Sequence, residues 1–107
     1  MTSTPAPDKH GMLEALTARV VDGEGRASRT ARRAAFDNTE TTEPSRTLIG
    51  KVARHPTTVA DHDITAARDA GLSEDQIFEL VVCAAVGQSA RQYQAALSAL
   101  SATDDEG

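Results

Sequence analysis

The residues best suited to proton transfer in this chain are two histidines and a glutamate. His62 belongs to the residue type that titrates near neutral pH, and it stands between the acidic residues Asp61 and Asp63. Glu79 is the nearest carboxylate expected on a facing helix, and His55 is a further histidine that could converge on the same site. A concave site formed by His62, Glu79 and His55 would support general acid–base catalysis. In the alternative interpretation, His62 is an exposed polar residue in the first turn of a helix.

Cys83 is the only cysteine in the sequence, and it lies within an apolar stretch. A thiolate that reacts with a peroxide needs a second thiol to complete the catalytic cycle, and this chain has none. We therefore expect neither alkylhydroperoxidase nor disulfide reductase activity. Cys83 is predicted to be a small buried side chain.

Spacing and composition exclude several other classes of function. His55, Asp61, His62 and Asp63 contain neither a histidine pair four residues apart nor an HExxH pattern, so we predict no metal site and no cofactor. The net charge of −5 and the 3% aromatic content argue against nucleic-acid binding, and the arginines of residues 26–33 are interpreted as a solvated helix face. No apolar run approaches the ~18 residues of a membrane span, so no membrane partner is expected. Without a signal-peptide pattern at the N-terminus, we expect a cytoplasmic protein.

The elements that position these residues are predicted to be helices only. A chain of 107 residues allows one domain, which we place at residues 10–100, with a disordered N-terminal segment at 1–9 and a disordered acidic tail at 101–107. A first helix should end near residues 22–25, and a second should begin at the cap Ser28 and end near Phe36. A third should begin at Pro44. A fourth should begin at Pro56 or after a Thr58 cap, and should end at Gly71.

The fifth helix has the strongest signals. Ser73 and Gln76 form a capping box, and the residues from 77 to 86 are apolar on nearly every face, which predicts a central, buried helix. Gly87 is expected to interrupt or bend it before a second amphipathic segment at residues 88–100. Four alanine-rich helices do not supply enough apolar surface to cover this helix. We therefore predict a homo-oligomer, most simply a dimer or trimer, with residues 77–100 at the interface.

The stretch from residue 62 to residue 97 resembles a known superfamily. His62-x4-Ala67-Arg68-x2-Gly71-Leu72-Ser73-x2-Gln76-Ile77-x-Glu79-Leu80-Val81-Val82-x-Ala84-Ala85 is similar to the AhpD-like, carboxymuconolactone decarboxylase superfamily. The resemblance implies an all-α, AhpD-like helical bundle of five to six helices. AhpD-type members use a C-x-x-C pair followed by x3-H for peroxide and disulfide chemistry. Those positions fall near His55, Thr58 and His62, so both cysteines are missing here.

Two functions are compatible with this resemblance. The first is a non-redox protein that acts as a structural or partner subunit, with itself or with a related protein subunit. The alternative is a small cysteine-independent decarboxylase or hydrolase that uses His62 as its general acid and base. The second function requires His62 to meet Glu79 in a pocket, with His55 as a further candidate, whereas the first requires an apolar, alanine-lined contact surface.

Overall fold

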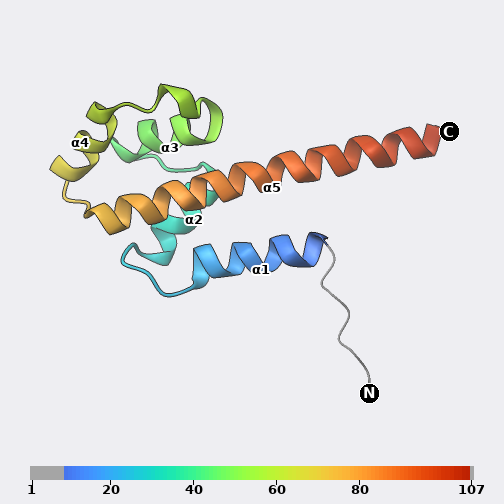
Figure 1. Cartoon of the computed structure of the whole chain (residues 1–107), viewed down its shortest axis with the longest axis horizontal. Coiled ribbons are helices and arrows are strands. Elements are labelled where there is room, and N and C mark those ends of the chain that lie inside the picture. Colours follow the sequence, from blue (N-terminus) through green and yellow to red (C-terminus); the bar gives the residue numbers. More distant parts are fainter. Residues whose placement is uncertain (1–8, 107) are drawn as a thin grey trace, which may run out of the picture.

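The computed structural model describes residues 9–106, so residues 1–8 and 107 lie outside the described part of the chain. Within it, α1 spans Lys9–Asp22, α2 Arg29–Asp37, α3 Ser45–Arg54, a 3-10 turn Pro56–Thr58, α4 Asp61–Asp69 and α5 Glu74–Glu106. The described residues contain no strand, which confirms the prediction of an all-α protein. Helices α2, α3 and α4 gather around the N-terminal half of α5, α1 runs alongside α5 as far as residues 90–94, and the C-terminal end of α5 extends beyond them (Figure 1).

Several helix ends lie where the local signals predict them. The Ser28 side chain accepts a hydrogen bond from the Ala31 N–H and caps α2. Ser73 and Gln76 exchange side-chain-to-backbone hydrogen bonds of 2.8 and 3.1 Å, which completes the capping box of α5. Gly71 adopts a φ of 103° after α4, in the left-handed region that favours glycine. These signals are confirmed because each involves residues within a few positions of one another.

Two helix starts differ from the prediction. Pro44 precedes α3 as its N-cap rather than occupying its first turn. Helix α4 begins at Asp61, so neither Pro56 nor Thr58 starts it, and Pro56 instead opens a separate 3-10 turn. The reason is a tertiary ion pair. Asp63 lies in the first turn of α4. Its carboxylate accepts hydrogen bonds from the Ala60 N–H and from the ammonium group of Lys51 on α3.

The predicted interruption of the last helix at Gly87 is wrong, because α5 is continuous from residue 74 to residue 106. Gly87 serves packing instead, since a Cβ atom at this position would collide with the backbone carbonyl of Phe36 at the end of α2. The helix also continues through residues 101–106, where the sequence predicted a disordered acidic tail. Residues 1–8 of the predicted N-terminal segment 1–9 lie outside the described residues, and residue 9 begins α1.

The hydrophobic core surrounds the first three turns of α5. Its larger cluster joins α1, α2, α3 and α5, and consists of Val21, Ala27, Ala35, Phe36, Ile49, Leu80, Cys83 and Ala84. A smaller cluster joins α3, α4 and α5 through Leu48, Ala67 and Ile77. Burial of α5 is one-sided even here, since Phe78 is 69% exposed. Helix α5 is therefore central to the core, as predicted, and the other helices leave one of its faces uncovered.

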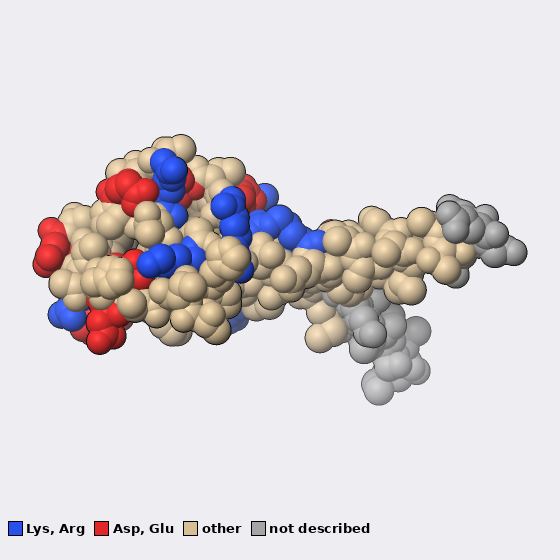
Figure 2. Space-filling model, turned by 90° about the horizontal axis from the view of Figure 1, so that it is seen from above, with Lys and Arg blue, Asp and Glu red and all other residues tan. Residues whose placement is uncertain are grey.

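Beyond the core, α5 forms a projecting arm, which we define as residues 94–103. Every residue of this arm is exposed. The arm gives the molecule extents of 52 × 41 × 20 Å and extends away from the rounded body in Figure 2.

Candidate functional site

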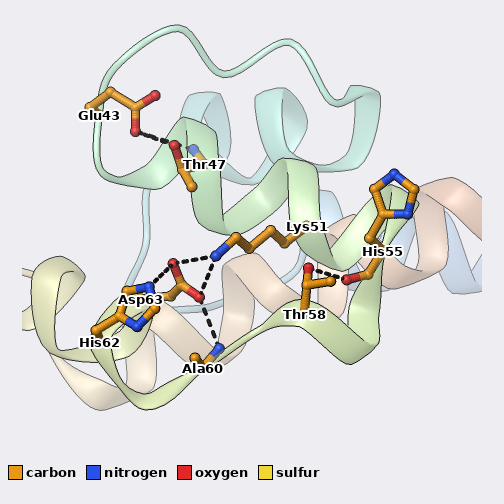
Figure 3. A network of polar contacts seen from close by, with 8 residues as sticks. All are labelled: Glu43, Thr47, Lys51, His55, Thr58, Ala60, His62 and Asp63. Atoms are coloured by element: carbon orange, nitrogen blue, oxygen red, sulfur yellow. Dashed lines mark hydrogen bonds and ion pairs between the residues drawn. The ribbon is translucent and has the colours of Figure 1, made fainter.

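His62 lies beside an ion pair that joins α3 to α4 (Figure 3). The Lys51 ammonium group donates to both oxygens of Asp63, at 3.0 and 2.9 Å, and the Asp63 side chain is buried. The Ala60 N–H donates to the same carboxylate at 2.9 Å. This backbone hydrogen bond, together with Lys51, lowers the pKa of Asp63. All of these donors are held within the protein, so the Asp63 carboxylate joins two helices and is fully engaged in doing so.

His62 itself faces solvent, with its side chain 79% exposed and its Nε2 atom 3.6 Å from Asp63 Oδ1. His55 also lies on the surface, at the end of α3, and its backbone carbonyl accepts a hydrogen bond from the Thr58 hydroxyl at 2.7 Å. The two imidazole rings lie on opposite sides of the Lys51–Asp63 pair in Figure 3. The histidines therefore do not converge on one site.

Glu79 contacts a different part of the molecule, the loop between α1 and α2. Its carboxylate accepts hydrogen bonds from the backbone N–H groups of Arg26 at 2.8 Å and Ala27 at 2.7 Å. These two hydrogen bonds lower the pKa of Glu79. Both carboxylate oxygens of Glu79 bind the backbone of this loop. Its contacts are therefore with the loop and not with His62, the partner predicted for it.

Arg32 of α2 binds the same loop. The prediction that it lies on a solvated helix face is wrong. The guanidinium is buried, and it donates to the backbone carbonyls of Gly23 at 2.6 Å and Val20 at 3.4 Å. It thereby satisfies carbonyl groups at and just beyond the C-terminal end of α1, where a cation is favourable. No sequence signal distinguishes Arg32 from its exposed neighbours Arg29 and Arg33, because its burial depends on where α1 ends in space.

An open cleft of about 660 Å³ lies over this loop, and its charges balance. Three arginines and three carboxylates line it with two glycines: Gly23, Glu24, Gly25, Arg26, Arg29, Arg32, Asp75 and Glu79. The Arg26 N–H already donates to Glu79, and Arg32 Nη1 already donates to backbone. An anionic ligand would meet equal numbers of both charges, so the cleft is not built as an anion site.

Cys83 is buried in the core, 1% exposed, and its Sγ lies 3.2 Å from the Val20 carbonyl oxygen as a hydrogen-bond donor. Burial raises the pKa of its thiol, which disfavours the reactive thiolate. Within residues 9–106, no three His, Cys, Asp or Glu side chains are grouped so that they could hold a metal ion.

The surface that remains without a partner is apolar and lies along α5. We call it the apolar strip. Its members follow one another at spacings of three or four residues, and these spacings keep them within roughly a third of the helix circumference. They are Phe78, Val82, Ala85, Ser89, Tyr93, Ala96 and Leu100. The strip is on the side of α5 opposite to core residues such as Leu80 and Ala84, so it faces away from the core.

Helix α1 adds apolar side chains along one edge of the strip. Leu16 lines a pocket of about 260 Å³ with Val20, Phe78 and Val82, and four charged residues line the same pocket: Arg19, Glu24, Arg32 and Glu79. It lines a second pocket of about 540 Å³ with Ser89 and Tyr93. The surface thus continues from the body onto the arm. The large hydrophobic side chains left exposed in the described residues all lie on α1 or α5: Met12 58%, Leu16 45%, Phe78 69%, Leu97 37% and Leu100 63%.

Charged residues are almost absent from α5 beyond Glu79. Between Glu79 and Asp104 the sequence contains one charged residue, Arg91. Its guanidinium donates to the Phe36 carbonyl at 2.6 Å and so points toward α2 rather than toward the strip. In Figure 2 the visible face of the arm is tan, whereas blue and red patches are scattered over the body. An exposed helix in a monomer normally carries charges on its solvent face, whereas an uncharged apolar one indicates a contact surface.

No protein-family model, curated protein or solved structure matches this chain. The similarity to the AhpD-like superfamily thus stays a prediction from the residues quoted above. Among the described helices, none combines the length and the apolar character needed to cross a lipid bilayer.

Proposed function

We propose that the protein is a non-catalytic association module, a structural subunit that binds a second copy of itself through the apolar strip of α5 and the adjoining edge of α1. The observation that carries this proposal is the arm, where ten successive residues are exposed without a single charge and Leu97 and Leu100 lie open to solvent. Covering such side chains is favourable by about 25 cal/mol for each Å² of apolar area.

A second copy is the partner that this chemistry favours. A basic or acidic partner would find no opposite charge between residues 80 and 103 except Arg91, whose guanidinium is bound within the protein. An identical arm is equally uncharged, so the pairing brings no like charges together along the strip. The contact would extend over about 33 Å of helix from Phe78 to Leu100, at 1.5 Å per residue.

The surroundings of the candidate catalytic residues speak against the alternative of an acid–base enzyme. Glu79 binds the loop after α1, and His62 lies in solvent beside a saturated ion pair. Cys83, buried and single, speaks against redox chemistry in the same way. The proposal is therefore a structural or partner subunit that is related to the AhpD-like superfamily only by the sequence resemblance.

Two matched variants test the proposal. Ala96→Glu introduces a charge into the strip, and Ser98→Glu introduces the same charge on the opposite side of the same exposed arm. Neither side chain belongs to the core, so both variants should fold alike by circular dichroism. We expect the unmodified protein and Ser98→Glu to sediment as dimers of the 11.3 kDa chain, and Ala96→Glu as a monomer. A monomeric unmodified protein at micromolar concentration would contradict the proposal.

A further inference from the structure

The apolar strip has an internal symmetry that bears on how two copies would face each other. Phe78 and Leu100 lie eleven residues before and after Ser89, close to three helical turns in each direction. Val82 and Ala96 lie seven residues from Ser89, and Ala85 and Tyr93 lie four residues from it. Ser89 is therefore the centre of a strip whose two halves differ in side-chain size.

Parallel pairing would use these sizes poorly. With the helices side by side in register, each residue of the strip faces its own copy, so Phe78 meets Phe78 and Ala85 meets Ala85. The pairs of large side chains would hold the helix axes apart, whereas the alanine pairs between them need a close approach. Two helices pack closely, at 8–10 Å, when a large side chain of one helix lies opposite a small side chain of the other.

Antiparallel pairing centred on Ser89 relieves this conflict between residues 82 and 96. Val82 of one copy then faces Ala96 of the other, and Tyr93 faces Ala85, so a large side chain meets a small one at each of these levels. Phe78 faces Leu100 at both ends, and the small Ser89 meets itself in the middle. The opposed directions of the two helices also bring opposite ends of their dipoles together.

In the antiparallel pair, the arm of one copy would lie against the body of the other copy, where a pocket is present. The pocket that Leu16 of α1 forms with Phe78 and Val82, and with charged residues at its border, lies at the level that residues 96–100 of the other copy would reach. Leu16 and Leu100, both exposed in the single chain, would then cover each other. In this arrangement, the arm of each copy docks in the pocket of the other copy.

We infer that two copies associate as an antiparallel pair of α5 helices centred on Ser89, with the arm of each copy docked against α1 and the N-terminal half of α5 of the other. This inference rests on the proposed function, because it specifies the orientation and register of the same interface. The contact is reciprocal, as a two-fold axis requires, and it closes on itself at two chains.

The test uses cysteines placed just outside the strip, so that the apolar side chains stay in place. Asp75 and Thr103 are both exposed, and they lie fourteen residues before and after Ser89. The variants Asp75→Cys and Thr103→Cys are prepared separately in the full chain, one of them isotopically labelled, and a short bifunctional maleimide is added to each alone and to their mixture. The unmodified chain, whose one cysteine is buried, is the control for background reaction.

We expect a covalent dimer in the mixture, with position 75 of one chain linked to position 103 of the other by mass spectrometry, and little in either variant alone. Links of 75 to 75 and of 103 to 103 in the separate variants would establish a parallel pair and overturn the inference. A dimer by sedimentation that forms none of these links would overturn it as well. Both results leave self-association intact, whereas a monomeric chain by sedimentation removes the proposed function itself.

Discussion

Gly87 in the middle of α5 packs directly against the backbone carbonyl of Phe36, the last residue but one of α2. The contact brings two helix backbones together without a side chain between them. Arg91, one turn further along α5, donates a hydrogen bond to the same carbonyl at 2.6 Å. The end of α2 is thus held against α5 at the level where the body gives way to the arm.

Gly87→Ala is expected to lower the free energy of unfolding by about 1–3 kcal/mol, because the added methyl group collides with backbone that cannot move aside alone. Gly50→Ala is the matched control. Gly50 also lies within a helix, but a Cβ there meets nothing within 4 Å, so the helix should gain about 0.5–1 kcal/mol. Urea unfolding followed by circular dichroism measures both. Equal effects of the two substitutions would show that the contact at Gly87 is not restrictive.

Glu79→Gln is expected to destabilise the protein at neutral pH by about 1–2 kcal/mol, because the two loop N–H groups lose a charged acceptor. The pKa of Glu79 is lowered in the folded state from its ordinary value of 4.5. The stabilisation from this carboxylate is therefore fully present above pH 4.5, and it is lost as the pH falls through the lower folded pKa. The difference between the unmodified protein and Glu79→Gln should shrink toward zero on acidification.

The control for this prediction is Glu24→Gln, which removes an exposed charge from the same loop and should change stability by less than ~0.5 kcal/mol. Unfolding free energies are measured for all three proteins at a series of pH values from neutral to acid. A constant difference at every pH would mean that the Glu79 charge contributes nothing to holding the loop.

Cys83 is expected to be unreactive in the folded protein, because burial raises the pKa of its thiol and covers its sulfur atom. Labelling with a thiol reagent should be slow in buffer and rapid in concentrated urea. Dithiol-dependent peroxide turnover should be at the level of a Cys83→Ser control. Rapid labelling of the native protein, or turnover that the substitution abolishes, would contradict this expectation.

Much of the candidate site could not be predicted from the sequence, because it depends on residues far apart in the chain. Glu79 is separated by more than fifty residues from the loop that it binds, so no local pattern assigns it to Ala27 rather than to His62. Arg32 likewise shares its type and spacing with exposed arginines. The prediction that residues 77–100 form an interface stays a prediction, and it rests on an apolar run that is visible in the sequence itself.

By itself, the sequence determined the helical elements, their caps at Ser28, Ser73 and Gly71, and the absence of a second thiol, since apolar periodicity and capping act within a few residues. The tertiary structure decided the rest. It made α5 continuous at Gly87, where the missing side chain admits another backbone, and it separated the histidines from Glu79. It also left one side of α5 uncovered. These outcomes depend on how helices pack in space, and packing energies belong to pairs of distant surfaces rather than to any local stretch of chain.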